Sequence, residues 1–321
     1  MNTAKLSAAG RRVLVIFNPT AGRRRRRTLA AVLRHLERAG CQVTVRPTAA
    51  RGDAETLARA ASAEGWDVVA VAGGDGTINE AVNGLYGHAL PLAVIPLGTA
   101  NVVAAELCMP SDPEAIADVI AEAPIRDIHL GEANGRLFVM MAGVGFDARV
   151  VEAMPAWLKR GLGKGAYVLM FLAGLYRFSR SPYRVTVDGE THGAASAVIA
   201  NGHFYAGRHS CAPLARLGEP LLYICLFLRP GPLHALRYGL WLLLGRLERL
   251  DDALILPGEK VTIEGPAGQP VQGDGDIIGR VPLTAGLSEK TLSVVAPPED
   301  WAAGRGQVEG DMEARACSGH P

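Results

Sequence analysis

The residues whose types and spacing most clearly suggest chemistry form the turn Gly73-Gly74-Asp75-Gly76-Thr77. An apolar run typical of a buried strand, residues 67–72, comes before the turn, and a helical pattern over residues 78–82 follows it. Glycines allow the backbone to approach a bulky anion, and the first turn of a helix directs free N–H groups at that anion. The pattern predicts a phosphate-binding turn, with an ordinary tight turn of an α/β protein as the alternative.

Asp75 distinguishes this turn from a simple anion site. A carboxylate repels phosphate unless a divalent cation or a transferable proton lies between the two groups. The sequence contains no G-x-x-x-x-G-K-[ST] motif and no G-x-G-x-x-G motif between a strand and a helix, which excludes the P-loop and Rossmann nucleotide sites. The turn therefore indicates a nucleotide bound together with a metal ion.

Two further turns follow strand-like runs. The run 13–17 ends at Asn18-Pro19-Thr20-Ala21-Gly22, and the run 92–95 ends at Pro96-Leu97-Gly98-Thr99-Ala100-Asn101. In a βαβ series with a parallel sheet, the carboxyl ends of successive strands meet at one edge. We therefore expect the three turns to lie together and to share one nucleotide.

In the order and spacing of these turns and of several other blocks, the sequence resembles the diacylglycerol-kinase catalytic family of lipid kinases. The resemblance is to its bacterial members of the YegS and DgkB types in particular, and also to the sphingosine and ceramide kinases. The resemblance covers about residues 11–297. NAD kinases and phosphofructokinases share the glycine-aspartate turn, whereas the later blocks are specific to lipid kinases. The later blocks are Gly143-Val144-Gly145-Phe146-Asp147-Ala148, Ala200-Asn201-Gly202 and Gly273-Asp274-Gly275-Asp276, and Thr48 with Gly52-Asp53-Ala54 also carries the resemblance.

The resemblance implies ATP as the phosphate donor and Mg²⁺ as its partner, with Asp75 organising the metal and the phosphates. It assigns nucleotide binding to the three turns and to the block at Thr48, with Glu80 in a supporting role. The implied nucleotide-binding residues are Asn18, Thr48, Gly73, Gly74, Asp75, Gly76, Thr77, Ile78, Asn79, Glu80, Gly98, Thr99 and Asn101.

Phosphoryl transfer to an alcohol needs a group that removes the hydroxyl proton, and a carboxylate near the acceptor can do so. In the resembled family this acid closes an Asp-Gly-Glu motif of the second domain, and the matching position here is Asp276. Because aspartate is one methylene shorter than glutamate, Asp274 and Asp75 stay open as alternative catalytic bases. An ordinary β-turn built from aspartate and glycine is the other interpretation of the Asp274–Asp276 motif.

A structural metal site is implied by a loop that family members related to YegS carry after an Ala-Pro pair. Here the loop spans residues 212–221 and keeps one acid, Glu219. Glu219 with the backbone carbonyls of Arg216 and Leu221 would form this site, and its absence is the alternative. A neighbouring glycine cluster of the family is reduced here to Tyr205-Ala206-Gly207-Arg208.

The elements that must position these residues fall into two parts. Strand and helix patterns alternate over residues 11–130, which predicts an open parallel α/β nucleotide domain with four helices. Residues 131–297 consist mainly of strand pairs and predict an antiparallel, β-sandwich-like domain for the lipid substrate. The expected architecture is NAD-kinase-like, with the site in the cleft between the domains. Residues 298–321 are expected to form a disordered tail.

Three segments bear on contact with lipid. Residues 164–178 and 232–250 are apolar helical stretches, and the second carries leucines at helical spacing. Both are interrupted by arginine and fall short of the roughly 18–20 uncharged residues that span a bilayer. Each is either a core-facing helix or a surface that lines a lipid entrance or enters the headgroup layer. The run Arg23–Arg27 either begins a solvated helix or contacts an anionic membrane or the nucleotide's phosphates.

Bulk properties complete the expectation. The 321 residues carry a formal net charge of +1, which excludes strong bulk attraction to nucleic acid, and residues 1–10 lack the apolar core of a signal peptide. We expect a cytoplasmic, ATP- and Mg²⁺-dependent kinase that phosphorylates a hydroxyl of diacylglycerol or a similar long-chain lipid at the inner face of an anionic membrane, with a homodimer as an open option. The alternatives are a soluble-substrate kinase of the NAD-kinase type and a catalytically weak nucleotide-binding regulator.

Overall fold

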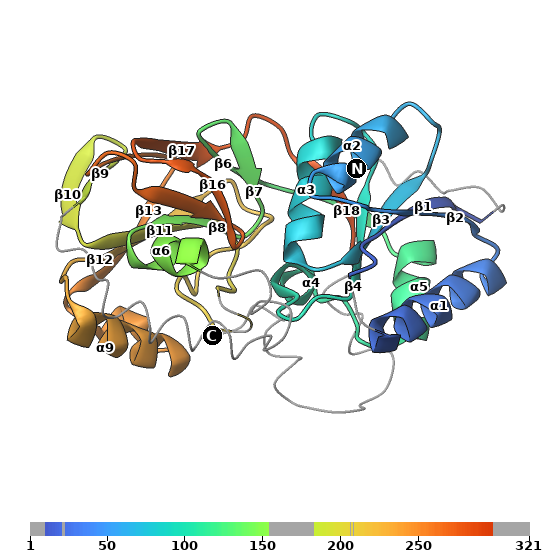
Figure 1. Cartoon of the computed structure of the whole chain (residues 1–321), viewed down its shortest axis with the longest axis horizontal. Helices are drawn as coiled ribbons and strands as arrows, with labels where there is room; N and C mark the ends of the chain where they lie inside the picture. The colour runs from blue at the N-terminus through green and yellow to red at the C-terminus, as the bar shows by residue number, and fades with distance from the viewer. Residues whose placement is uncertain (1–9, 21–22, 154–182, 206, 208, 298–321) are drawn as a thin grey trace. The chain divides into compact units, whose positions relative to one another are not determined.

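The computed structural model describes residues 10–20, 23–153, 183–205, 207 and 209–297. The chain divides into two compact units (Figure 1). The first contains the residues up to Asp127 and those from Leu292 onward, and the second runs from Ile128 to Thr291. The predicted apolar helix 164–178 and the predicted tail 298–321 lie outside the described residues.

A six-stranded sheet forms the centre of the first unit, in the order β2-β1-β3-β4-β18-β5. Strands β1 to β4 and β18 pair in parallel, and Figure 1 shows helices α1 and α5 on one face of the sheet and α2 and α3 on the other. The elements are β1 (Arg12–Phe17), α1 (Arg23–Arg38), β2 (Gln42–Pro47), α2 (Asp53–Ala61), β3 (Val68–Gly73), α3 (Asp75–Leu85), β4 (Leu92–Pro96), α4 (Val102–Glu106), α5 (Pro113–Glu122), β5 (Ile125–Ile128) and β18 (Leu292–Val295).

Buried aliphatic residues explain this sheet. Strand β3 reads Val-Val-Ala-Val-Ala-Gly and is buried along its whole length, as expected for a parallel strand covered on both faces. Val13 and Val15 of β1 pack with residues of α1 and α5 in one apolar core. The four helices predicted for this unit are present, and the parallel α/β arrangement is confirmed. The short helix α4 was not predicted.

Strand β18 brings the last described part of the chain back to the first unit. Val294 of β18 stands opposite Leu92 of β4 in a parallel pairing, and both side chains are buried. From the sequence we expected residues 292–297 to belong to the second domain, whereas β18 (Leu292–Val295) pairs with β4 of the first sheet. The four residues Leu-Ser-Val-Val of this strand do not indicate which sheet it joins, because strand pairing depends on the neighbouring strand that tertiary packing provides.

Two six-stranded antiparallel sheets form the second unit, in the orders β10-β9-β14-β17-β6-β7 and β13-β12-β11-β8-β15-β16. One apolar core contains buried residues of both sheets, which makes the unit a β-sandwich as predicted. The elements are β6 (Gly131–Ala133), β7 (Arg136–Phe138), β8 (Met141–Val144), α6 (Phe146–Ala153), β9 (Tyr183–Val187), β10 (Glu190–Ala194), β11 (Ser196–Ala200), β12 (Leu222–Phe227), α9 (Pro232–Leu243), the 3₁₀ turn Leu247–Arg249, β13 (Ala253–Gly258), β14 (Lys260–Glu264), β15 (Pro270–Gly273), β16 (Asp276–Arg280) and β17 (Leu283–Leu287).

Helix α9 places its leucines outward. Its buried face consists of Ala235 and Tyr238. The core-facing interpretation of the 232–250 leucine pattern is therefore wrong for the leucines up to Leu244 and right for Leu247 and Leu250, which are buried after the helix ends. The helix ends at Leu243, earlier than the predicted 232–250. No helix among the described residues is long and apolar enough to cross a membrane. The exposed leucines, with their exposed fractions, are Leu233 (80%), Leu236 (46%), Leu240 (54%), Leu243 (60%) and Leu244 (57%).

Candidate active site

The carboxyl ends of four neighbouring strands lie level in the first sheet. Phe17 of β1 stands opposite Pro47 of β2 and Ala72 of β3, and Gly73 of β3 stands opposite Pro96 of β4. The turns that follow these strands therefore start at one edge of the sheet, as the sequence predicted. This edge is where open parallel α/β sheets bind their ligands.

Hydrogen bonds tie these turns to one another. The Asn18 side-chain amide donates to Thr77 Oγ1 at 3.0 Å, which joins the turn after β1 to the start of α3. The Leu97 N–H donates to the Gly73 carbonyl at 2.9 Å, which joins the turns after β3 and β4. Thr48, buried at the end of β2, donates its N–H to the last carbonyl of β1 at 2.8 Å. The predicted residues of four strand ends thus form one connected surface.

Space, rather than backbone conformation, requires the glycines at this edge. Gly74 is extended, with φ −103° and ψ 179°, a conformation that any residue adopts. A Cβ atom on Gly98 would lie 2.6 Å from the Gly74 Cα and 2.5 Å from Asn101 Oδ1. A Cβ atom on Gly73 would lie 2.8 Å from the Thr77 Cβ. The glycines therefore allow two turns to touch backbone to backbone.

Asp75 lies in the first turn of α3, directly after the N-cap residue Gly74. Its Oδ1 accepts a hydrogen bond of 3.1 Å from the Val103 N–H at the start of α4. Asn101, the residue before α4, has a left-handed backbone with φ 50°. Its Oδ1 is buried and has no hydrogen-bond partner in the part of the chain that the structure describes. Carboxylate and amide oxygens of this kind are the ligands that Mg²⁺ prefers.

Three residues of the predicted nucleotide set support the start of α3 from inside. The N–H groups of Thr77 and Ile78 both donate to the Gly74 carbonyl, at 2.9 and 3.1 Å. The Ile78 side chain is fully buried, and Asn79 is buried and accepts hydrogen bonds from Asn83 one turn later. Ile78 therefore belongs to the core beneath the turn rather than to its surface.

Two arginines of the Arg23–Arg27 run contact the turns. The Arg25 guanidinium donates to Thr99 Oγ1 at 3.1 Å, and that of Arg26 donates to the Pro19 carbonyl at 3.3 Å. A guanidinium presents a planar fork of N–H donors that matches phosphate oxygens. Of the interpretations left open by the sequence, these contacts favour an arginine that faces the nucleotide's phosphates, and Arg25 joins the candidate residues.

In the second unit, Asp274 is an anchor for the backbone. Its Oδ2 accepts a hydrogen bond of 2.7 Å from the Val139 N–H, and its Oδ1 accepts bonds of 2.9 and 3.1 Å from the N–H groups of Met140 and Met141. Asn201 satisfies the same irregular stretch from the other side, since its side-chain amide donates to the Val139 carbonyl at 2.7 Å. With both oxygens engaged by the main chain, Asp274 is poorly suited to accept a substrate proton.

Asp276 begins strand β16 and is half-buried. The turn before it depends on Gly275, whose φ of 81° lies in the left-handed region that glycine adopts without strain. The Gly275 N–H donates to Gln272 Oε1 at 3.0 Å. Gln272 was not predicted as a site residue, although it directly precedes the Gly-Asp-Gly-Asp block, and this position could have identified it.

A half-buried carboxyl group, that of Asp147, lies behind this turn. Asp147 on α6 accepts hydrogen bonds of 2.6 Å from the Tyr205 hydroxyl, through Oδ1, and from the Gln272 side-chain amide, through Oδ2. Loss of solvent around the carboxyl group raises the pKa of Asp147 above its ordinary value, and the two hydrogen bonds offset only part of this shift. Burial and the adjacent Asp147 carboxylate raise the pKa of Tyr205 well above its ordinary value. The sequence singled out the block around Asp147 but not these partners.

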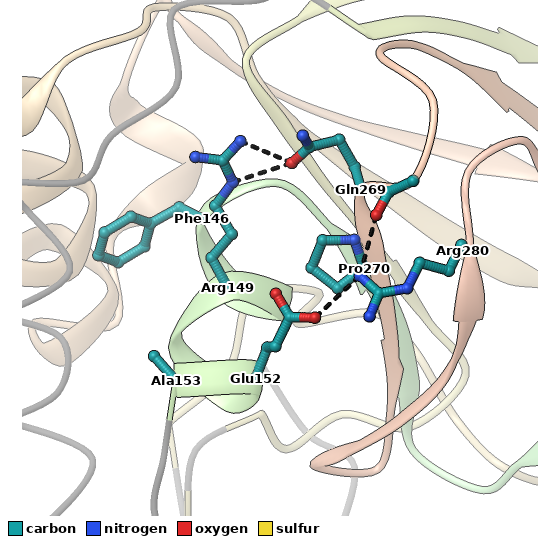
Figure 2. Close-up of a pocket in the computed structure, with 8 residues that line it drawn as sticks. Phe146, Arg149, Glu152, Ala153, Gln269, Pro270 and Arg280 are labelled. Atoms are coloured by element: carbon teal, nitrogen blue, oxygen red, sulfur yellow. Dashed lines mark hydrogen bonds and ion pairs between the residues drawn. The ribbon is translucent and has the colours of Figure 1, made fainter.

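A cavity of about 400 Å³ opens beside α6 (Figure 2). Arg149 donates to Gln269 Oε1 through two N–H groups, at 3.0 and 2.6 Å. Arg280 donates to Glu152 at 2.8 Å and to the Gly268 carbonyl at 2.9 Å. Both guanidinium groups are therefore already paired. The lining residues are Phe146, Arg149, Glu152, Ala153, Gly268, Gln269, Pro270 and Arg280.

The loop over residues 212–221 does not fit a metal ion. The Arg216 guanidinium donates to the carbonyls of Pro213 and Ala215, at 2.9 and 2.8 Å, and so brings a positive charge into the loop. The Arg216 carbonyl accepts the Glu219 N–H, and the Glu219 side chain is exposed. The described residues contain no group of three or more His, Cys, Asp or Glu that could hold a metal. We derive no role for a structural metal here.

Comparison with known proteins agrees with this geometry. Residues 12–133 match the description of a diacylglycerol kinase catalytic domain, and residues 140–296 match that of a YegS C-terminal NAD kinase beta sandwich-like domain. A Chromohalobacter salexigens protein named "Probable lipid kinase YegS-like" is 32% identical over 271 residues, which are 81% of this chain and 85% of that protein. The chain belongs to the diacylglycerol kinase family. The kinase predicted from the sequence is confirmed at the level of this family.

Other relatives cover almost the whole kinase. A protein from Bacillus subtilis named diacylglycerol kinase is 29% identical over 297 residues, which are 90% of this chain and 97% of that protein. A crystal structure of a diacylglycerol kinase from Bacillus anthracis has a TM-score of 0.70 and 22% identity, and covers 91% of this chain and 99% of its own. At this identity the structural likeness shows the shared fold, which confirms the two-domain α/β and β-sandwich prediction.

Replacing Gly98 by alanine should push apart the turns after β3 and β4, because the new Cβ would meet the Gly74 backbone at 2.6 Å. We expect the free energy of unfolding of the kinase to fall by about 1–3 kcal/mol, as for other overpacked sites, together with weaker nucleotide binding. Urea denaturation and nucleotide titration measure the two effects. Gly193→Ala is the control, since a Cβ there has nothing within 4 Å; equal behaviour of both variants would contradict the close contact.

Replacing Asp274 by asparagine should mainly cost stability. Asparagine keeps one acceptor oxygen, but its NH₂ group would face backbone N–H groups that now donate to the carboxylate. The expected loss is about 1.5–3 kcal/mol in the free energy of unfolding, measured by urea denaturation. Asp188→Asn is a matched control, because Asp188 accepts the N–H groups of Glu259 and Lys260 at another turn. An Asp274 variant with unchanged stability but no phosphoryl transfer would instead make Asp274 the base.

Proposed function

We propose that this kinase uses ATP and Mg²⁺ to phosphorylate a hydroxyl of diacylglycerol or of a similar long-chain lipid. The observation that carries the proposal is the level edge of β1 to β4, where three turns, Asp75 and the guanidinium of Arg25 come together. The two family matches and the names of the relatives support a lipid alcohol as the acceptor.

On the nucleotide side, Asp75 and Asn101 provide the oxygen atoms that would hold Mg²⁺. Arg25 and Thr99 lie where a phosphate chain would cross the turn after β4. When bound, ATP supplies the phosphoryl group and Mg²⁺ offsets the negative charge that its oxygens carry. Thr48, at the end of β2, extends the same edge toward the remainder of the nucleotide.

On the acceptor side, we assign the general base to Asp276. Asp274 is engaged by three backbone N–H groups and holds the chain between β7 and β8. Asp276 follows in the same turn, is half-buried and begins a strand, so its position is defined by a sheet rather than by a loop. A carboxylate placed in this way takes the hydroxyl proton as the oxygen attacks phosphorus.

We further propose that the kinase works on the inner face of an anionic membrane. The five exposed leucines on and beside α9 form a stripe that apolar lipid chains would cover. The segment from Arg229 to Asp252 carries four arginines against three acids, so its attraction to lipid is mainly hydrophobic. From the basic run, Arg23, Arg24 and Arg27 would add the electrostatic part, on the order of 1 kcal/mol per arginine near the surface, whereas Arg25 and Arg26 contact the nucleotide turns.

Replacing Asp276 by asparagine should lower the chemical step by roughly 10²–10⁴-fold and leave nucleotide affinity nearly unchanged, because a base acts on the alcohol. Asp276→Glu should be tolerated or improved, since the family carries glutamate there. Asp75→Asn should abolish metal-dependent phosphate binding and cost at least about 10²-fold in turnover. Single-turnover transfer from labelled ATP to micellar diacylglycerol separates these cases. An Asp276→Asn variant close to wild type would contradict the assigned base.

Sedimentation with vesicles tests the membrane surface. Changing Leu240 and Leu243 to serine should weaken binding to neutral and anionic vesicles at least about tenfold, because fully burying one leucine contributes about 1.5–3 kcal/mol. Changing Arg23, Arg24 and Arg27 to glutamine should weaken only the anionic, salt-sensitive part, because Arg25 and Arg26, which contact the nucleotide turns, are kept. Leu214→Ser is the control, as an isolated exposed leucine of a loop. Loss of self-association instead of lipid binding in the α9 variant would show that a second copy covers the stripe.

A further inference from the structure

A chain of hydrogen bonds runs from the interior of the second unit to the turn that carries Asp276. The Tyr205 hydroxyl donates to Asp147 at 2.6 Å, and Asp147 accepts the Gln272 side-chain amide at 2.6 Å. The other end of the Gln272 side chain accepts the Gly275 N–H at 3.0 Å. The first two links connect residues far apart in the sequence, so the chain exists only in the folded unit.

The direction of every bond in this chain is determined by Asp147. A carboxylate only accepts, so it fixes the NH₂ end of Gln272 toward itself. The carbonyl end of Gln272 must then face Gly275, where a backbone N–H needs an acceptor. Gln272 is 1% exposed, so it has no alternative partner in water. A polar group left unpaired at this depth would carry its full desolvation penalty.

The neighbouring backbone makes this bond matter for position. Strand β15 changes register against β16 between Val271 and Gln272, so only the pairs Gln272–Ile277 and Gly273–Asp276 connect the turn to the ladder. Asp274 and Gly275 both have a left-handed backbone, with φ 49° and 81°. Asp274 is held from the β7–β8 side, whereas the Gln272 bond holds Gly275, the residue directly before Asp276.

We infer that Asp147 is a positioning residue, which aims Asp276 at the acceptor hydroxyl by orienting Gln272 and, through it, the Gly275 backbone. This inference rests on the proposed function, because it takes Asp276 as the base. Asp147 itself touches no reacting atom in this arrangement. Its effect should therefore fall on the chemical step rather than on nucleotide binding, since a displacement of about 1 Å in a reacting group can cost about 10²-fold in rate.

Exchanging the acid and the amide provides the test. In Gln272→Glu, a second carboxylate would face Asp147 at the 2.6 Å contact, and the two acids would separate or share a proton. In the double variant Asp147→Asn with Gln272→Glu, the new amide on α6 donates to the new carboxylate on β15. That carboxylate still accepts the Gly275 N–H, the Tyr205 hydroxyl still has an acceptor, and the net charge is unchanged. The exchange therefore restores all three hydrogen bonds, and only the bond between positions 147 and 272 has its donor and acceptor reversed.

We expect Gln272→Glu to lower single-turnover transfer roughly 10–100-fold with the KM for ATP within about twofold of wild type. The double variant should recover to within about threefold of wild type. Asp147→Asn alone should lose less, because its amide can turn to keep Gln272 while leaving the Tyr205 proton unpaired. Asp188→Asn should lower stability without changing transfer, which separates positioning from general destabilisation.

Hydrogen exchange at Gly275 gives a readout independent of activity. Gln272→Glu should make this amide exchange about tenfold faster, and the double variant should restore protection, because exchange reports local opening of the bond. Unchanged exchange and transfer in Gln272→Glu would overturn the inference, as would faster exchange with normal transfer. If Asp276→Asn retains wild-type transfer, the proposed base fails, while the exchange data still decide whether Asp147 orders the turn.

Discussion

The carboxylate of Asp274 accepts three consecutive backbone N–H groups where the chain passes from β7 into β8. Val139 and Met140 are buried and lie between the two strands, and leaving these N–H groups unpaired would cost several kcal/mol in total. Asn201 completes the arrangement by donating to the Val139 carbonyl, and its own N–H donates to the Met140 carbonyl at 2.8 Å. Two blocks that mark the family in sequence thus stabilise one piece of backbone.

These hydrogen bonds to Asp274 place the two acids of the Asp-Gly-Asp turn in different surroundings. Oδ1 of the first acid already accepts two backbone N–H groups, and such an oxygen has little capacity left for a substrate proton, which is why we propose the second acid as the base. Strand β16 then starts at the second acid with its backbone direction already set. Gln272 and Asp147 fix the residue between the two acids. Asp276, which is shorter than the glutamate expected at this position, therefore follows a turn that Asp274 holds on one side and Gln272 on the other.

In the first unit, the corresponding constraint is the close approach of Gly74 and Gly98. A Cβ at Gly98 would lie 2.6 Å from the Gly74 Cα, so the two strand ends can lie level in this way only when position 98 lacks a Cβ; a Cβ at Gly74 would meet the Gly98 Cα at a tight 3.2 Å. The approach brings Asp75 within reach of the Val103 N–H and places helix α4 beside α3. The motif glycines are thus needed first for the protein's own packing, and the surface that results is suited to phosphate.

The sequence by itself determined the strand–turn–helix order, the parallel first sheet and the β-sandwich, because hydrophobic period and turn residues are local properties. It also identified Asp75, Asp274 and Asp276 through spacing and family resemblance. Only the tertiary structure showed what surrounds them, since the N–H groups that Asp274 accepts come from residues about 130 positions away in the chain. It likewise decided that β18 joins the first sheet and that the α9 leucines face outward, because burial depends on which surfaces meet and not on the spacing of leucines along a helix.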